Sequence, residues 1–313
     1  MTLFVNFSIA TPTKHNNEGV VEFRGLDITV HNDIGDSSHQ SEYDQSIPMV
    51  TINNDPFFGS TDVHQLFAIG DVHGSIDELN ELVNRIKYDY RKGDRIIFMG
   101  DLVDKGPDSV AVIRRAKELN AWCVRGNQDD VTLRMWNYLK QNNISPSIKS
   151  NEIMQEGSVI DPINLSDSHI KIASNMTDED YRYLNSCPKI LGIPALNSLF
   201  VHGGVDPRKS LKNQVPYFVM NMRSVKEDGT PTENRTKVNW ADDWNRFQAS
   251  RDLAVKKPYS DVYYGHDSKL GLQLKAHTFG LDSGCVFGNQ LTALELRSRK
   301  LTQVFCKKYA DHS

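Results

Sequence analysis

The pattern of hydrophobic and polar positions changes near residue 64. Residues 1–63 are polar and show no periodicity, as in the stretch "NDIGDSSHQSEYDQS", which is typical of a largely disordered arm. One segment of this arm, "VVEFRGLDITV", is apolar enough to form a strand or a docking motif. Residues 64–313 alternate short apolar runs with amphipathic segments, so we expect the folded, functional domain there.

The alternation after residue 64 predicts the order of the elements. Strands are expected at the apolar runs "QLFAIGD", "DRIIFMGD" and "AWCVRGN". Helices are expected at "IDELNELVNRIKYDY", "SVAVIRRAKEL" and "DDVTLRMWNYLKQ", where apolar positions recur at helical spacing. A polar stretch at about 142–176 is expected to be an insertion over one face, after which Thr177 should cap a further helix.

The second half of the chain is richer in strands than the first. Strands are expected at "NSLFVHGG", "DVYYGHD", "LKAHTFGLDSG" and "NQLTALEL". A β-α-β-α-β half followed by a mostly β half predicts an α/β fold, with two mixed β-sheets packed face to face and flanked by helices.

The net charge and the cysteine spacing argue against certain kinds of binding partner and site. The net charge of −4 gives no electrostatic reason to expect DNA as a partner, because nucleic-acid-binding domains usually carry a basic excess. An anionic substrate would have to be attracted locally, by metal ions or by a few basic side chains. The cysteines, which are Cys123, Cys187, Cys285 and Cys306, show no CxxC spacing. Their pattern therefore predicts neither a disulfide framework nor a cysteine zinc site.

Targeting signals are weak in this chain. No apolar run approaches the roughly 20 residues of a membrane-spanning helix, and "MTLFVNFSIA" lacks the basic leading segment of a signal peptide. Five Asn-x-Ser/Thr sequons, at Asn6, Asn143, Asn164, Asn175 and Asn234, would permit glycosylation in a luminal compartment. The sequence leaves the compartment and the oligomeric state open.

Small oxygen and imidazole side chains follow the expected strands in order. They stand beside glycines in "GDVHG", "GDLVDKG", "RGNQDD", "VHGG" and "YGHD". In open α/β sheets ligands bind beyond the carboxyl ends of the strands, so we expect these side chains to meet at one edge. Carboxylate, amide and imidazole ligands suit ions such as zinc, manganese or iron.

The number of these side chains indicates two ions rather than one. A catalytic ion keeps an open position, whereas two ions can share one carboxylate in a two-metal site. The predicted ligands are Asp71, His73, Asp101, Asn127, His202 and His266, with Asp101 as the bridge. Each motif alone more often marks a turn or a packed histidine, and only their ordered combination carries the prediction. The histidines of the arm, of the insertion (His169) and of the tail are not assigned to the centre. His277 is a candidate neighbour of the centre, the alternative being a role in packing.

Over about residues 66–296 these motifs resemble the calcineurin-like metallophosphoesterases. The resemblance is to the branch that contains the phosphoprotein phosphatases and the bacterial diadenosine tetraphosphatases. Lys105 stands where protein phosphatases carry arginine, and "FVMNMRS" and "GLDSGCVFGNQLTALEL" are similar to the ApaH-like subgroup, in particular to the fungal zinc-dependent endopolyphosphatases.

The resemblance implies a ligand set and a reaction. It implies Asp71, His73 and Asp101 on one divalent ion, and Asp101, Asn127, His202 and His266 on the other. It implies two zinc or manganese ions and direct attack of a metal-bridging hydroxide on phosphorus, in keeping with the lowered pKa of metal-bound water. The fungal members face the vacuole behind a membrane anchor that this chain does not show, so vacuole and cytoplasm are both retained.

Gln128 departs from the family pattern. The family usually reads Gly-Asn-His, and that histidine, paired with the carboxylate equivalent to Asp104, protonates the leaving group. A glutamine supplies no proton, and a general acid is worth about 10²–10⁴-fold in rate. A phosphate leaving group, with a pKa of ~6, needs the proton less than an alkoxide does. Gln128 with Asp104 therefore favours a phosphoanhydride substrate, the alternative being drift in a weak or inactive enzyme.

The leading substrate is inorganic polyphosphate, cut by an endopolyphosphatase. Lys105 and Arg223 are the predicted phosphate contacts. Further cations that could line a channel are Arg208, Lys209, Lys256, Lys257, Lys269 and Lys275.

Other functions stay open. A dinucleoside polyphosphate or mRNA-cap pyrophosphohydrolase would need a base-stacking aromatic, for which Tyr217, Phe218, Trp240 and Trp244 are available. A Ser/Thr protein phosphatase is disfavoured by Lys105 and Gln128. An inactive scaffold that binds partners through the arm is the remaining alternative.

Overall fold

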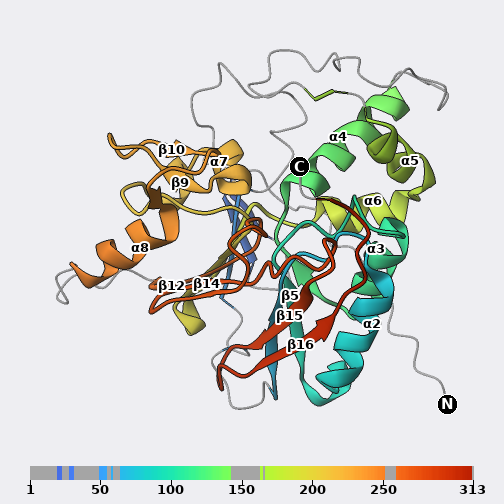
Figure 1. Ribbon diagram of the computed structural model, residues 1–313, viewed down its shortest axis with the longest axis horizontal. Coiled ribbons are helices and arrows are strands. Elements are labelled where there is room, and N and C mark those ends of the chain that lie inside the picture. The colour runs from blue at the N-terminus through green and yellow to red at the C-terminus, as the bar shows by residue number, and fades with distance from the viewer. Residues whose placement is uncertain are drawn as a thin grey trace.

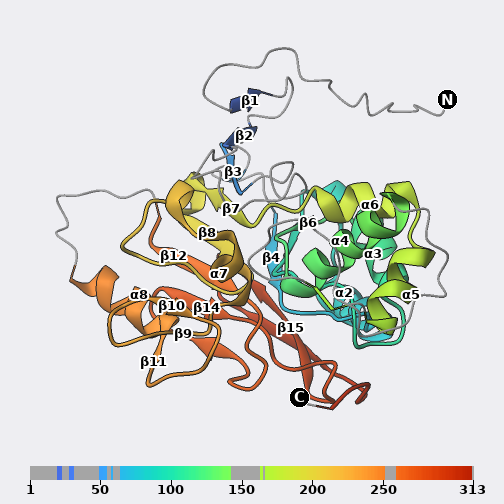
Figure 2. The same ribbon diagram turned by 90° about the horizontal axis from the view of Figure 1, so that it is seen from above.

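Two β-sheets lie face to face in the computed structural model, with helices on both outer sides (Figures 1 and 2). The structure describes residues 20–22, 28–31, 49–54, 58, 64–141, 163–164, 166–250 and 259–311. This architecture confirms the predicted α/β fold of two mixed sheets flanked by helices.

The five-stranded sheet has the order β16-β15-β4-β5-β6. Its strands are β4 (Leu66–Ile69), β5 (Arg95–Phe98), β6 (Trp122–Cys123), β15 (Gln290–Glu295) and β16 (Leu301–Phe305). Strands β4, β5 and β6 are parallel, and β15 pairs antiparallel with both β4 and β16.

The eight-stranded sheet has the order β1-β2-β3-β7-β8-β12-β14-β13. Its strands are β1 (Val20–Glu22), β2 (Ile28–His31), β3 (Val50–Asn53), β7 (Ile190–Ile193), β8 (Ser198–Val201), β12 (Asp261–Tyr264), β13 (Gln273–Leu274) and β14 (Thr278–Gly280). Strands β8, β12 and β14 are parallel. A small third sheet joins β9 (Ser224–Val225), β10 (Pro231–Thr232) and β11 (Val238–Asn239).

The helices form two outer layers (Figure 2). Beside the five-stranded sheet lie α2 (Ile76–Arg85), α3 (Ser109–Glu118), α4 (Asn127–Gln141), α5 (Asp167–Asn175) and α6 (Asp178–Asn185). Beside the eight-stranded sheet lie α7 (Pro216–Asn221) and α8 (Trp240–Ala249). Short 3-10 helices occur at Tyr90–Lys92, Pro194–Leu196 and Leu211–Asn213.

The side chains of β4 show how its sequence specifies this layering. Leu66 and Ala68 belong to the apolar cluster between the two sheets, whereas Phe67 and Ile69 belong to the cluster under the helices. Because successive strand residues face opposite sides, a wholly apolar strand is expected where both faces are covered. A third cluster fills the space between the eight-stranded sheet and α7 and α8.

The predicted elements differ from the structure at particular points. The first predicted helix ends earlier, at Arg85, and Lys87 then takes a left-handed φ of 55°. Thr177 does cap α6, where its hydroxyl accepts from the backbone N–H of Asp180 and the Asp180 carboxylate accepts from that of Thr177.

Two segments expected to lie outside the regular fold contain regular structure. In the predicted arm, β3 pairs in parallel with β7, and β1 and β2 pair antiparallel beside it. In the predicted insertion, α5 begins at Asp167. Most of residues 1–63 and all of 142–162 lie outside the described residues.

Two disulfides join segments that are distant in the sequence. Cys123 pairs with Cys187, and Cys285 pairs with Cys306. The cysteine spacing indicated no disulfide framework, and the structure contains these two disulfides. Local spacing carries no signal for pairs separated by 64 and 21 residues, which only the packed sheets bring to Cα–Cα distances of 5.1 and 5.2 Å.

Candidate metal centre

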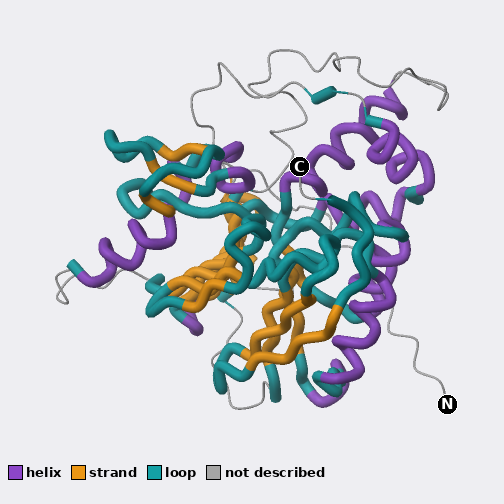
Figure 3. Tube along the Cα trace, viewed as in Figure 1, coloured by secondary structure: helices purple, strands orange, loops and turns teal. Residues whose placement is uncertain are grey.

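The carboxyl ends of five strands meet where the two sheets adjoin. Strands β4, β5 and β6 lead to Asp71, Asp101 and Asn127, and β8 and β12 lead to His202 and His266. Figure 3 shows loops gathered beside the strands of both sheets in the middle of the molecule. The structure thus brings together side chains that the sequence spreads over about two hundred positions.

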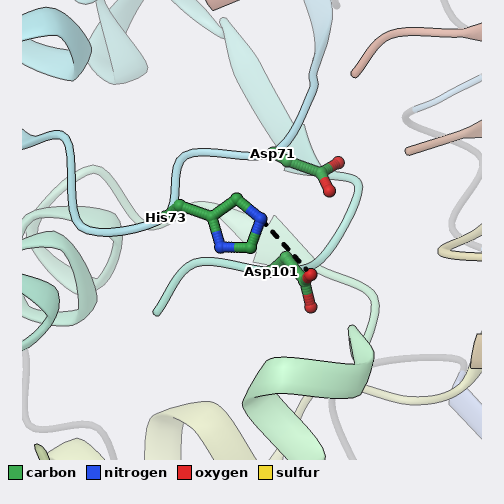
Figure 4. Close-up of side chains that lie close together, drawn as sticks. All are labelled: Asp71, His73 and Asp101. Carbon is green, nitrogen blue, oxygen red and sulfur yellow. Dashed lines mark ion pairs between the residues drawn. The ribbon is translucent and has the colours of Figure 1, made fainter. Parts of the chain in front are cut away.

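Asp71, His73 and Asp101 form one half of the centre (Figure 4). One ligand atom from each lies within 4.8 Å of the others, and all three side chains are buried. His73 Nε2 lies 3.5 Å from Asp101 Oδ2. Its Nδ1 lies 2.9 Å from the Val103 carbonyl, which can only accept, so Nδ1 carries the hydrogen and the Nε2 lone pair faces the carboxylates.

Asn127, His202 and His266 form the other half. Asn127 Oδ1 lies 3.0 Å from His202 Nε2 and 3.1 Å from His266 Nδ1. His202 Nε2 also lies 3.4 Å from Asp101 Oδ1, which places Asp101 between the two halves.

Backbone carbonyls fix the orientation of these two imidazoles. His202 Nδ1 donates to the Met99 carbonyl at 2.8 Å, and His266 Nε2 donates to the Asn221 carbonyl at 2.9 Å. The remaining nitrogen of each ring points at the Asn127 oxygen. Such outer hydrogen bonds commonly hold metal-binding histidines in the correct tautomer.

The backbone is constrained at the same residues. His73, Asp101 and His266 have left-handed φ angles of 46°, 47° and 72°. Non-glycine residues adopt this region at a cost of about 1–3 kcal/mol each, and such residues cluster at functional sites.

Two glycines allow close approach to the carboxylates. A Cβ on Gly126 would lie 2.1 Å from Asp101 Oδ1, and a Cβ on Gly265 would lie 2.0 Å from Asp71 Oδ1. No side chain fits in either space. The glycines of "RGN" and "YGH" are therefore required by packing against the centre.

Helix α4 begins at the centre and holds Asp101 in place. The Gln128 backbone N–H donates to Asp101 Oδ1 at 2.9 Å. The buried Asp129 carboxylate accepts from the backbone N–H of Leu102 at 2.9 Å and of Gly126 at 3.0 Å. It thus ties the loop after β5 to the start of α4, where the helix dipole favours negative charge.

The electrostatics of the cluster favour a bound cation. Burial, and then the charge of Asp282, raise the pKa of Asp71 well above its usual value. Burial alone would lower the pKa of His202, but Asp101 and Asp71 raise it to about 10. Burial, and then the charge of Lys105, lower the pKa of His73 to about 4. The buried carboxylates thus create a demand for positive charge, which a divalent ion bound by carboxylate and imidazole ligands would meet.

A pocket of about 330 Å³ lies over the centre. Its described lining includes ligands of both halves, namely His73, Asp101, Asn127 and His266, together with Gln128 and Asp282. It also includes the cationic side chains of Lys105, Arg223, Arg235 and Lys269, and the ring of Phe287. Lys105 and Arg223 are the two predicted phosphate contacts.

Arg235 and Phe287 were not foreseen. Arg235 stands in "TENRTK", which carries no pattern that marks a site residue. Phe287 stands in a segment that resembles the ApaH-like subgroup but was not itself assigned a role. Only the packing of the small third sheet and of the loop after β14 brings them to the pocket.

Several weaker candidates lie elsewhere. Trp240 and Trp244 are buried in the core and offer no face to a base. Arg208 pairs with Asp206 and Asp243, and Lys275 pairs with Asp242. Lys256 and Lys257 lie outside the described residues.

His277 lies away from the centre. It contacts Asp261 at 3.0 Å at the amino-terminal ends of β12 and β14, whereas His266 follows the carboxyl end of β12.

His169 is a histidine that sequence reasoning left aside, and it reaches the centre from α5. Its Nε2 lies 3.1 Å from Gln128 Oε1 and 3.9 Å from Asp104 Oδ2. No local pattern predicts this approach, because His169 stands outside every glycine-flanked motif.

The fold and the site define a metal-dependent phosphohydrolase. Residues 64–288 match the family model described as calcineurin-like phosphoesterase, so the chain belongs to this family. The match includes strands of both large sheets and all the predicted ligands.

Particular relatives lie in the predicted subgroup. The chain is 29% identical to a symmetrical bis(5'-nucleosyl)-tetraphosphatase of Janthinobacterium sp. (strain Marseille), over 78% of this chain and 97% of that protein. It is also 29% identical to the zinc-dependent endopolyphosphatase of Saccharomyces cerevisiae, over 76% of this chain and 77% of that protein. The resemblance to the ApaH-like subgroup is confirmed.

A solved structure agrees with these relatives. The crystal structure of a candidate diadenosine tetraphosphatase superposes with a TM-score of 0.63 at 26% identity, covering 82% of this chain and 98% of that one.

Proposed function

We propose that this protein hydrolyses phosphoanhydride bonds and that its substrate is inorganic polyphosphate. Asp71, His73 and Asp101 would hold one divalent ion, and Asp101, Asn127, His202 and His266 a second, with zinc or manganese as the ions. Such ions supply an activated water and neutralise charge on the phosphoryl oxygens.

The cationic pocket is the observation that carries this proposal. The chain is negative overall, yet Lys105, Arg223, Arg235 and Lys269 surround a pocket that opens onto the candidate ligands. Cations in a concave site raise the local concentration of an anionic substrate. Several separate cations fit a repeating polyanion better than a single phosphate group does.

Arg223 has the clearest phosphate-binding geometry. Its Nε is buried and has no hydrogen-bond partner among the described residues, while its Nη1 donates to the Glu233 carbonyl at 3.3 Å. Asp267 Oδ1 lies 4.0 Å from Nε, beyond hydrogen-bond distance. The guanidinium is thus held at the pocket with donor capacity that a phosphate oxygen could use.

A dinucleoside polyphosphate is the second candidate substrate. It is favoured by the tetraphosphatases among the relatives and by Phe287, the one aromatic side chain among the described residues that line the pocket. Cap pyrophosphohydrolysis would use the same base-stacking contact. Both substrates require cleavage of a phosphoanhydride bond. They differ in the group near that bond, which is further phosphate in polyphosphate and a nucleoside in the dinucleoside polyphosphate.

Product analysis tests the proposal. Chelated protein is reloaded with zinc, manganese, cobalt or magnesium and given long-chain polyphosphate, diadenosine tetraphosphate or a phosphoserine peptide. We expect polyphosphate to be shortened with zinc or manganese, and internal cutting to give products of intermediate length. If diadenosine tetraphosphate is turned over faster than polyphosphate, the dinucleoside polyphosphate is the substrate instead. Turnover confined to the phosphopeptide would overturn the phosphoanhydride assignment.

We further propose that the protein folds in an oxidising compartment, such as the vacuolar lumen. Stable disulfides are typical of such compartments and rare in the cytosol, and the described residues include two disulfides and no free cysteine. None of the described helices has the length and apolar character of a membrane span. Thiol alkylation of protein taken directly from its native cells checks this proposal: unreacted cysteines support it, and four labelled thiols contradict it.

A further inference from the structure

Helix α5 places His169 beside the position where the family carries the histidine that protonates the leaving group. In this chain that position is Gln128, whose Oε1 lies 3.1 Å from His169 Nε2. Asp104, the carboxylate partner of the missing histidine, lies 3.9 Å from the same nitrogen. Both His169 and Asp104 are about nine-tenths buried at the edge of the centre.

We propose that His169 is the general acid of the reaction, so that an imidazole from α5 replaces the one lost from the start of α4. This inference rests on the proposed function. As the water oxygen bonds to phosphorus, the bond from phosphorus to the leaving oxygen breaks. The Nε2 proton of the imidazolium moves to that oxygen, and the neutral ring later regains a proton from the solvent. The attacking water also gives up a proton, so the overall reaction consumes only water.

The hydrogen bonds of His169 leave the proton on the required nitrogen. Gln128 Oε1 and Asp104 Oδ2 can only accept, so Nε2 carries a hydrogen toward them. On the other side of the ring, Nδ1 lies 2.7 Å from Ser166 Oγ, the cap of α5, which can accept the Nδ1 hydrogen of the protonated ring. Gln128 thus orients the acid and supplies no proton itself.

Packing between α4 and α5 fixes this contact. Ile170 and Ala173 of α5 are buried in a small apolar cluster with Met135 of α4, and further side chains of α4 pack against them. His169 precedes Ile170 and therefore reaches the amino-terminal end of α4, where Gln128 lies. The helix that the sequence assigned to a polar insertion is in fact docked on the site.

The surroundings suit a proton donor. Burial lowers the pKa of His169, the charges of Asp104 and Asp101 act to raise it, and that of Lys105 acts to lower it. A lowered pKa makes the imidazolium a stronger acid but leaves less of it protonated at neutral pH. Activity that depends on this proton should therefore fall as pH rises through the pKa of His169.

The inference changes what Gln128 says about the substrate. The loss of histidine at this position no longer implies that the enzyme lacks an acid. The preference for phosphoanhydrides then rests on the pocket and on the relatives, and a weak or inactive enzyme becomes a poorer explanation of Gln128.

The first test uses His169→Gln on substrates with different leaving groups. Aryl phosphates from 4-nitrophenol to phenol are compared, together with polyphosphate. We expect turnover of the phenyl ester to fall by about 10²–10³-fold and that of the nitrophenyl ester by less than about tenfold. His277→Gln is the matched control, because His277 also pairs with an aspartate but lies at the far end of β12. It should leave all rates unchanged.

Rescue and pH profiles separate an acid from a structural residue. Adding Gln128→His to His169→Gln restores an imidazole beside Asp104 and should recover at least tenfold of the lost rate. With polyphosphate, the wild-type decline in kcat/KM at high pH should disappear in His169→Gln. Metal content and Tm should match the wild type.

A measurement without turnover completes the test. In the ion-loaded protein, the ring signals of His169, assigned by their loss in His169→Gln, should titrate at lower pH in Asp104→Asn, because Asp104 favours the protonated ring. The inference is overturned if the active wild type and His169→Gln have the same leaving-group dependence and the same pH profile. It is also overturned if the His169 ring titrates at the same pH in Asp104→Asn as in the wild type. If the wild type turns over no phosphorus compound, the proposed function fails as well.

Discussion

Arg223 has an unusual environment for a single charged residue. Its side chain is 26% exposed, and Asp267 is its nearest acidic partner, with 4.0 Å between Nε and Oδ1. Burial lowers the pKa of the guanidinium, and Asp267 acts to raise it. The residue is therefore held at the pocket partly desolvated, with donor capacity left for a substrate oxygen.

Replacing Arg223 should weaken substrate binding. A hydrogen bond to a charged group is worth about 1.5–3 kcal/mol, so kcat/KM for polyphosphate should fall by roughly 10–10²-fold in Arg223→Ala. Arg223→Lys keeps the charge but loses the planar fork, and it should recover only part of the loss. Steady-state kinetics with Arg246→Ala as the surface control measure the effect. Equal activity of Arg223→Ala and Arg246→Ala would remove Arg223 from the site.

At the scale of single residues, the sequence was informative about the ligands. Asp71, His73, Asp101, Asn127, His202 and His266 were predicted from glycine-flanked strand ends, and the structure brings all six together. The reason is local, because the steric demand for glycine beside a ligand is visible in the sequence. Arg235 and His169 have no such local demand and could not be predicted.

At the scale of elements, a disulfide connects the two sheets next to the centre. Cys123 ends β6, and Cys187 lies three positions before the first residue of β7. The Arg125 backbone N–H donates to the Pro188 carbonyl at 2.8 Å. These links hold the short segment that leads from β6 to Asn127.

Removing this disulfide should destabilise the protein and loosen the metal site. In the chain-entropy account a closed loop of this length contributes about 4 kcal/mol, so the double variant Cys123→Ser, Cys187→Ser should unfold at lower urea concentration. It should also bind zinc more weakly. The pair Cys285→Ser, Cys306→Ser is the control, with a shorter loop worth about 3 kcal/mol. Unfolding curves for the Cys123–Cys187 pair that overlay the wild type would show that the pair is not bonded in solution.

Element prediction succeeded where periodicity was strong. The parallel strands β4, β5 and β6 and the helices between them follow the expected order. Strand β3 and helix α5 lie in segments too polar to show a pattern, and both obtain their stability from neighbours, β7 and α4 respectively. Tertiary packing commonly overrides weak local preference in this way.

At the scale of the whole molecule, bound ions should stabilise the fold. The centre gathers buried carboxylates from strand ends in the five-stranded sheet and in the eight-stranded sheet, including Asp71 and Asp282. Ions bound there link elements from both sheets. A ligand present at 100 times its Kd adds about 2.7 kcal/mol per site to the free energy of unfolding.

Chelation should therefore lower the Tm, and zinc or manganese should restore it together with activity. Thermal unfolding with metal analysis measures both. Asp71→Asn should bind less metal and show a smaller Tm shift, whereas Asp77→Asn, which changes an exposed acid on α2, should respond like the wild type. A Tm that chelation and reloading leave unchanged, with no bound ion found by metal analysis, would argue against a metal centre.

The sequence by itself determined the fold class, the order of the main elements and the six candidate ligands that the structure brings together. These depend on periodicity and on steric rules that act within a few residues, which one chain displays directly. The tertiary structure alone decided the disulfides, the place of Arg235 in the pocket and the contact of His169 with Gln128. Those contacts join residues separated by 64, 21 and 41 positions, and they exist only because the sheets and helices pack in one arrangement. The sequence around each residue does not indicate its distant partner, so local conformational preference cannot predict these pairings.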